Sequence, residues 1–318
     1  MIKRNSLFKK CIASVMCLVV GALSLTACDI PGRDKENDGK LNIVTTIFPS
    51  YDFAKELCGD GATVTMLLKP GQESHTYEPT AQDILAIEKC DLFIYVGGEN
   101  DKWVEDILES FDEPVDTVRM IDFADTCTDS HDEDSHDHEG HEHETDEHVW
   151  TSPKNAISIT QGICEKLCKI DSENKDKYEQ NCDSYVKELE ALCGEIQSVV
   201  DSSKRKTLVF GDRFPFVYFA RDFGLDCYAA FEGCSTETEP SAQTMASLIE
   251  RINADNIPVV LYIEFSAQTV ADSIAEQTGC KSLLFHSCHN VTDEEIENGA
   301  TYLSLMRGNI EVLKEALN

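Results

Sequence analysis

The sequence predicts an α/β protein with two lobes, each built on a parallel sheet, joined by one long rigid helix. Short β-rich runs alternate with segments of helical periodicity from Leu41 onward, and the alternation resumes near Lys206. Between the two series, apolar residues recur at three- and four-residue steps over residues 172–202. Alternating strands and helices favour parallel sheets that are covered by helices, and the uninterrupted periodicity favours a single helix.

The first lobe is expected to span residues 41–171. Its predicted strands are 41–47, 62–68, 91–97 and 115–121, and its predicted helices are 50–58, 80–89, 101–111 and 154–170. Pro153 favours the start of the last helix, because proline lacks an amide hydrogen and its fixed φ suits the first helical turn.

Residues 172–203 are expected to form the linking helix, with a length of roughly 45 Å. A helix of this length restricts how far two lobes can swing, so we expect only a small closure. The second lobe is expected over residues 204–318. Its predicted strands are 206–212, 225–231, 258–264 and 281–287, and its predicted helices are 214–223, 240–254, 267–278 and 300–317.

Residues 1–27 have the pattern of an export signal. Four basic residues precede an uncharged apolar run over residues 11–25, which is shorter than the roughly 20 residues that a spanning helix needs. The run ends in LTAC, which resembles the lipobox of bacterial lipoproteins. We therefore expect a lipid on Cys28 that holds the chain on the outer face of the membrane, with residues 28–40 as a tether.

The chain is strongly acidic, with a formal net charge of −32 that becomes −32 − 4 = −36 without the four basic residues of the signal. Such a charge repels phosphates and concentrates cations, so it argues against nucleic-acid binding.

Fourteen cysteines are present, and eleven remain once Cys11, Cys17 and Cys28 are set aside. They show no CxxC spacing, although Cys164 and Cys168 lie four apart on one helical face. We interpret most of them as small buried apolar residues, with a disulfide framework as the alternative.

Residues 129–147 fit neither lobe. They contain ten acids and five histidines, without Lys or Arg, and the histidines are His131, His136, His138, His141 and His143. Such a segment cannot bury a core, so we expect a disordered loop. A solvated acidic loop would not require histidine, whereas imidazoles among carboxylates suit weak binding of Zn²⁺, Ni²⁺ or Cu²⁺. The loop is therefore a candidate accessory metal collector.

Four histidines lie outside that loop, at His75, His148, His286 and His289. His75 follows the second predicted strand, His148 precedes the helix that begins at Pro153, and His286 closes the last predicted strand. Parallel sheets place ligands beyond the carboxyl ends of their strands. We therefore regard His75, His148 and His286 as candidate metal ligands.

Several segments resemble the zinc- and manganese-binding solute receptors of ABC importers. They include MLLKPGQESHTYEPTAQDI, DEHVWTSPKNAI, RDFGL and TYLSLMRGNIEVL, and with their neighbours they run from about residue 41 to the C-terminus. The resemblance implies two α/β lobes joined by a rigid helix, with one metal in the cleft between them. It also implies an extracytoplasmic receptor that passes the ion to a permease and its ATPase without catalysing a reaction.

His75 and His148 match the two histidine ligands that this family supplies from its first lobe. The third ligand comes from a motif like HxAFxYF, which aligns with RFPFVYF and places Arg213 at the ligand position. A guanidinium does not bind zinc, so the chain departs from the pattern here, and the neighbouring Asp212 is the substitute that we expect.

Arg213 is expected instead to pair with an acid such as Glu78 or Glu232. The fourth family ligand, an aspartate at the end of a strand, aligns with His286 in LLFHSCHN. We expect His286 to replace that carboxylate, with His289 as a less favoured donor.

Three neutral imidazoles with a carboxylate or a water favour four-coordinate Zn²⁺, whereas Mn²⁺ prefers more oxygen ligands. The alternatives are a manganese receptor, a metal-buffering surface protein involved in cell adhesion, and a zinc-dependent hydrolase with Glu264 as its base. The sequence contains no HExxH, GxSxG or GxxxxGK[ST] motif, which argues against the hydrolase.

Overall fold

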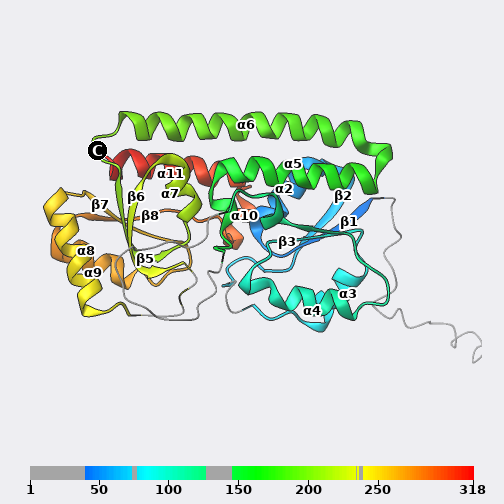
Figure 1. The fold of residues 1–318 in the computed structure, drawn as a ribbon, viewed down its shortest axis with the longest axis horizontal. Coiled ribbons are helices and arrows are strands. Elements are labelled where there is room, and N and C mark those ends of the chain that lie inside the picture. Colours follow the sequence, from blue (N-terminus) through cyan, green and yellow to red (C-terminus); the bar gives the residue numbers. More distant parts are fainter. Residues whose placement is uncertain (1–39, 74–76, 127–144, 234, 236–238) are drawn as a thin grey trace, which may run out of the picture. The chain divides into compact units, whose positions relative to one another are not determined.

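The computed structural model describes residues 40–73, 77–126, 145–233, 235 and 239–318 (Figure 1). All the described residues belong to one compact unit, Lys40–Asn318. Among the described residues, no helix has both the length and the apolar character needed to cross a membrane. The candidate residues outside the described ranges are Cys28, His75, His131, His136, His138, His141 and His143.

The first lobe is built on a four-stranded parallel sheet with the order β2-β1-β3-β4. Its strands are β1 (Leu41–Thr45), β2 (Ala62–Met66), β3 (Leu92–Tyr95) and β4 (Thr117–Arg119), and its helices are α2 (Phe48–Cys58), α3 (Ala81–Glu88), α4 (Lys102–Ser110) and α5 (Pro153–Ile170). Every residue of β3 is buried, as expected for a central strand that is covered on both faces. Helices α3 and α4 lie on one side of the sheet, and α2 and α5 lie on the other (Figure 1).

The second lobe repeats this plan with the order β6-β5-β7-β8. Its strands are β5 (Thr207–Phe214), β6 (Asp226–Glu232), β7 (Val259–Tyr262) and β8 (Lys281–Leu284), and its helices are α7 (Val217–Phe223), α8 (Ala242–Asp255), α9 (Thr269–Thr278), α10 (Asp293–Glu297) and α11 (Tyr302–Ala316). The short helix α10 was not predicted. Strand β8 ends at Leu284 rather than at residue 287, so His286 lies in the loop that follows the strand.

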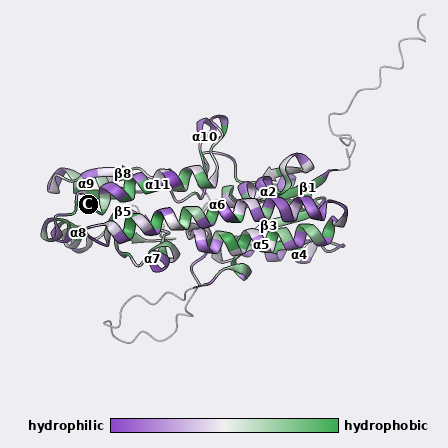
Figure 2. Cartoon of the chain, turned by 90° about the horizontal axis from the view of Figure 1, so that it is seen from above, coloured by the Kyte–Doolittle hydropathy of each residue, from purple (hydrophilic) through white to green (hydrophobic). Residues whose placement is uncertain are grey.

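Helix α6 (Lys175–Ser202) joins the two series and is 28 residues long, or about 42 Å. It packs against α2 and α5 of the first lobe and against α11 of the second. Hydrophilic and hydrophobic residues alternate along it (Figure 2), and the buried ones recur at three- and four-residue steps. The predicted α/β architecture with one long amphipathic helix is therefore confirmed.

The loop after β8 contacts the first lobe directly. The Trp150 indole Nε1 donates to the Ser287 carbonyl at 2.9 Å, and the Asn290 amide Nδ2 donates to the Lys69 carbonyl at 2.8 Å. The Tyr302 hydroxyl at the start of α11 donates to the Trp150 carbonyl at 2.7 Å. These bonds bring residues 287–290 of the second lobe against the turn that precedes α5 and against the segment that follows β2.

Candidate metal site

His148 lies in the turn before α5 and is fully buried. Its backbone amide donates to the Asp146 Oδ1 at 2.8 Å, and its ring Nδ1 lies 3.1 Å from the same oxygen. Burial alone would lower the pKa of His148, but the Asp146 and Glu147 carboxylates together raise it. A proton held on Nδ1 by Asp146 leaves the Nε2 lone pair for a metal, which is the usual arrangement of a metal-binding histidine.

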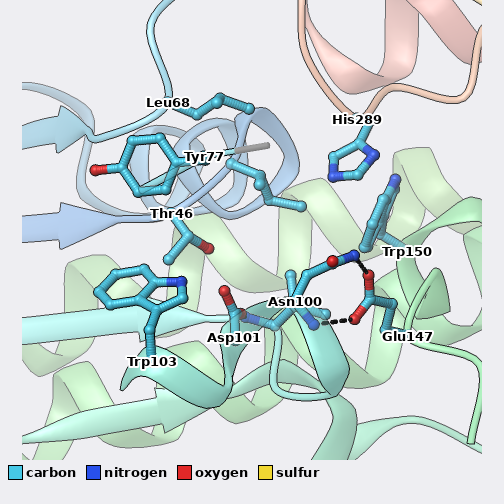
Figure 3. A pocket seen from close by; sticks show the side chains of 11 residues that line it. Thr46, Leu68, Tyr77, Asn100, Asp101, Trp103, Glu147, Trp150 and His289 are labelled. Atoms are coloured by element: carbon cyan, nitrogen blue, oxygen red, sulfur yellow. Dashed lines mark hydrogen bonds between the residues drawn. The ribbon is translucent and has the colours of Figure 1, made fainter. Parts of the chain in front are cut away.

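His289 brings a second imidazole next to His148. The two ring centroids are 5.8 Å apart with an interplanar angle of 87°, and the His289 ring lies 4.8 Å from the Trp150 ring (Figure 3). The His289 amide donates to Glu264 Oε1 at 3.1 Å, and the Ser287 amide donates to Glu264 Oε2 at 2.7 Å. Glu264 therefore uses both oxygens to hold the loop that presents His289.

His148 and His289 line one pocket together with Glu73, Arg213 and Glu264. The empty volume of the pocket is about 350 Å³, including some open solvent. Arg213 Nη1 lies 3.1 Å from Glu73 Oε1, and Nη2 lies 3.5 Å from Glu73 Oε2, which is a forked ion pair between the lobes. This pair neutralises the guanidinium that stands at the expected ligand position.

Glu73 thus has the role that the sequence suggested for Glu78. The side chain of Glu232, the other predicted partner of Arg213, is outside what the structure describes.

His286 lies apart from this pocket. Its Nδ1 accepts the Cys288 amide at 2.9 Å, and its Nε2 lies 3.6 Å from the Glu295 carboxylate on α10. The Asn309 side chain bonds both its backbone amide and its carbonyl. Burial alone would lower the pKa of His286, but the carboxylates of Glu264 and Glu295 raise it. The ring therefore lies between the Glu264 and Glu295 carboxylates, and it does not line the pocket.

Asp212 is also directed elsewhere. Its Oδ1 accepts the Arg213 amide at 2.8 Å, and its Oδ2 accepts the Ile263 amide at 3.1 Å. These bonds tie β5 to the end of β7 where the register of β5 with β6 shifts, between Phe210 and Arg213. The buried carboxylate of Asp212 thus stabilises the sheet.

Within the described ranges, no three His, Cys, Asp or Glu side chains are grouped so that they could hold a metal ion. Among the described candidates, His148 and His289 are the imidazoles that line one pocket, and His75, the other candidate from the first lobe, lies outside the described ranges.

A second pocket, of about 400 Å³ including some open solvent, lies on the other side of His289 and is lined by Tyr77, Trp103, Trp150, Asn100 and Glu147 (Figure 3). Glu147 Oε2 accepts the Asn100 amide at 3.1 Å. Gly98, with a φ of 122°, permits this approach, because a Cβ there would lie 2.8 Å from the Glu147 Cβ. The chain just before His148 is thereby tied to the segment that follows β3.

Asp146 and Glu147 were not singled out by the sequence, because they belong to the acidic run that predicts a disordered loop. The structure describes both as partly or fully buried and bonded. The sequence feature that could have identified them is their position, one and two residues before a histidine near the start of a helix.

Comparison with known proteins gives consistent matches. A family model described as "Zinc-uptake complex component A periplasmic" matches residues 43–316. The zinc-binding lipoprotein AdcA of Streptococcus pneumoniae is 34% identical over 92% of this chain, and the chain spans 58% of its length. The high-affinity zinc uptake system protein ZnuA of Bacillus subtilis is 31% identical over 89% of each chain. The Zn(II)-bound ZnuA-like domain of S. pneumoniae AdcA has a TM-score of 0.73 at 31% identity, covering 88% of this chain and 99% of that domain.

Proposed function

This chain belongs to the family of zinc-uptake complex component A proteins, and from that premise we propose that it is an extracytoplasmic receptor that captures Zn²⁺ for an ABC-type importer. It acts as a solute receptor and not as an enzyme. Zn²⁺ is its cargo, so the site has to bind the ion tightly and also release it.

The observation that carries the proposal is the pairing of His148 with Asp146. A carboxylate on one ring nitrogen of a buried histidine orients the ring and raises the basicity of the other nitrogen, and metal sites use this arrangement widely. The Asp146 carboxylate lies 3.1 Å from the His148 Nδ1, where this arrangement requires it.

The geometry favours His289 as the donor from the second lobe. If two imidazole nitrogens bind one tetrahedral Zn²⁺ at about 2.0–2.1 Å, the ring centroids are about 5 Å apart. The 5.8 Å between the His148 and His289 centroids requires only a small adjustment to reach this value. The His286 ring would have to give up the hydrogen bond from the Cys288 amide and its contact with the Glu295 carboxylate to do the same.

We therefore assign His148 and His289 as imidazole ligands, with His75 as the third donor that the family resemblance suggests. This set replaces His286 and Asp212, whose side chains are engaged in structural bonds. A water or a carboxylate would complete four-coordinate ligation, which suits Zn²⁺ better than Mn²⁺.

The ion pair of Arg213 with Glu73 sets the charge of the pocket. A free guanidinium beside His148 would repel a divalent cation, whereas the forked pair presents no net charge. Because Glu73 belongs to the first lobe and Arg213 to β5, the same pair also holds the lobes together across the site.

Calorimetric titration of the metal-free protein with Zn²⁺, with Mn²⁺ as competitor, tests the proposal. We expect one tight zinc site that resists Mn²⁺, and a loss of at least tenfold in affinity in His289→Ala. His286→Gln is the matched control, a buried histidine three residues away, and it should retain the tight site. If His286→Gln bound zinc weakly and His289→Ala bound it normally, His286 and not His289 would be the ligand.

Anchoring through a lipid on Cys28, delivery to a permease with its ATPase, and weak metal collection by the histidines of residues 129–147 complete the proposal. Cells that express the protein should incorporate labelled fatty acid into it, and Cys28→Ala should abolish that label and release the protein from the membrane. Unchanged labelling of Cys28→Ala would refute the anchor and leave the zinc site untouched.

A further inference from the structure

Three cysteine side chains lie together between α5 and α6, and none of them lines the metal pocket. Cys164 and Cys168 lie one turn apart on α5, and Cys182 lies on α6. The neighbouring Cys182 thiol and burial raise the pKa of the Cys164 thiol, whereas the Cys168 thiol lowers it, so the three side chains are neighbours. Cys164 and Cys182 are buried in the apolar core, whereas Cys168 is half-buried at its edge.

The helical hairpin itself brings Cys164 and Cys182 to one level. Helix α5 ends at Ile170, α6 begins at Lys175, and the turn between them is centred on residue 173. Residues equally far from the centre of an antiparallel hairpin lie opposite each other, and 173 − 9 = 164 while 173 + 9 = 182. Both side chains lie on the buried faces of their helices. Their proximity therefore follows from the backbone.

We propose that Cys164 and Cys182 form a reversible disulfide, and that Cys168 is the thiol through which a low-molecular-weight disulfide reacts. The half-buried position of Cys168, with its Sγ 3.9 Å from the Lys175 carbonyl, makes it the accessible member of the group. The buried Cys164 and Cys182 then take part in thiol–disulfide exchange with Cys168.

The thiol–disulfide exchange needs no reactant besides the three protein thiols and the external disulfide. The Cys168 thiolate attacks the external disulfide, forms a mixed disulfide and releases one small thiol. Cys164 attacks the Cys168 sulfur and releases the second small thiol, and Cys182 then attacks the Cys164 sulfur and frees Cys168. Two protein thiols are oxidised in total, and one external disulfide is reduced to two thiols.

The disulfide would tie the linking helix to the first lobe. It closes a loop of 182 − 164 = 18 residues, which spans the end of α5, the turn and the start of α6. Constraining such a loop in the unfolded chain should raise the unfolding temperature by roughly 6–10 °C. The inference needs no metal, so it is independent of the proposed zinc function.

The experiment is to incubate the purified full chain with oxidised glutathione, block the free thiols and digest with trypsin. Lys154, Lys166, Lys169, Lys177 and Lys187 place each cysteine in its own peptide, namely 155–166, 167–169 and 178–187. We expect peptide 155–166 to be linked to 178–187, with reversal by dithiothreitol.

Three variants complete the test. Cys182→Ser should lose both the cross-link and the gain in unfolding temperature, and Cys168→Ser should form the cross-link at least tenfold more slowly. Cys90→Ser, a cysteine in the first lobe outside this group, should behave as the unaltered chain. A stable glutathione adduct on Cys168 without the cross-link would overturn the proposal. A final disulfide between Cys164 and Cys168, seen as peptide 155–166 linked to 167–169, would also overturn it. So would a stoichiometric bound metal that protects the three thiols from oxidation.

Discussion

Replacing Asp52 by asparagine should make the metal-free protein more stable above pH 7 and leave its stability nearly unchanged below pH 4. Asp52 lies on α2 and is almost fully buried where α2, α6 and α11 meet. Its Oδ2 accepts the Tyr302 amide at the start of α11 at 2.9 Å and the Tyr185 hydroxyl of α6 at 3.3 Å. Asparagine keeps an oxygen that can accept both bonds and removes the charge.

The magnitude follows from the pKa. Burial, with a smaller contribution from the neighbouring Glu56 carboxylate, raises the pKa of Asp52 from 3.8 to about 7. The unfolded chain therefore loses this proton first as the pH rises, so the folded state loses stability between about pH 4 and pH 7. A shift of about three units at 1.36 kcal/mol each corresponds to about 4 kcal/mol, which is the upper limit of the stabilisation at pH 8.

Denaturant unfolding of both proteins at pH 4, 5.5, 7 and 8, with a chelator present because bound zinc would add stability, measures the difference. Asp60→Asn, which removes an equal charge from an exposed position, should show no such rise with pH. A difference between Asp52→Asn and the unaltered chain that stays constant from pH 4 to pH 8 would refute the reasoning. A variant that is less stable at pH 8 would mean that the charged hydrogen bonds outweigh burial.

Three further predictions concern the metal pocket. Asp146→Asn should weaken zinc binding by about 10–100-fold in calorimetry, because the His148 ring loses its orienting carboxylate. Unchanged affinity would show that Asp146 has no such role. Deleting residues 129–144 should remove only weak zinc sites, whereas deleting 129–147 should abolish the tight one, and equal effects of the two deletions would contradict this. Glu73→Gln should reduce zinc affinity roughly three- to tenfold by exposing the Arg213 charge, and the double variant with Arg213→Gln should recover it; a double variant as weak as Glu73→Gln would assign the loss to another cause.

Local patterns predicted the architecture because they are properties of neighbouring residues. Burial on both faces produces continuous apolar runs such as Leu92–Tyr95, and a helix that packs on one side repeats its apolar positions every three or four residues, as α6 does. The capping residue Ser152 and Pro153 likewise indicate where α5 begins. These signals need no knowledge of distant contacts.

The site could be predicted only in part. His148 became a candidate ligand from the sequence because a histidine just before a capped helix is a local feature. His286 and His289 both follow β8. The sequence favoured His286 because it aligns with the strand-end aspartate ligand of the family, but the strand ends earlier in the structure, at Leu284. Glu264 binds the Ser287 and His289 amides from a different strand, and this long-range contact determines which ring faces the pocket.

The sequence by itself determined the two parallel sheets, the long linking helix, the acidic character and the supply of imidazoles. Tertiary structure alone decided that Arg213 pairs with Glu73, that Asp146 orients His148, and that Cys164 meets Cys182. The physical reason is range. Periodicity and capping act within a few residues, whereas the direction of a side chain in a loop depends on hydrogen bonds and charges from parts of the chain that folding brings together.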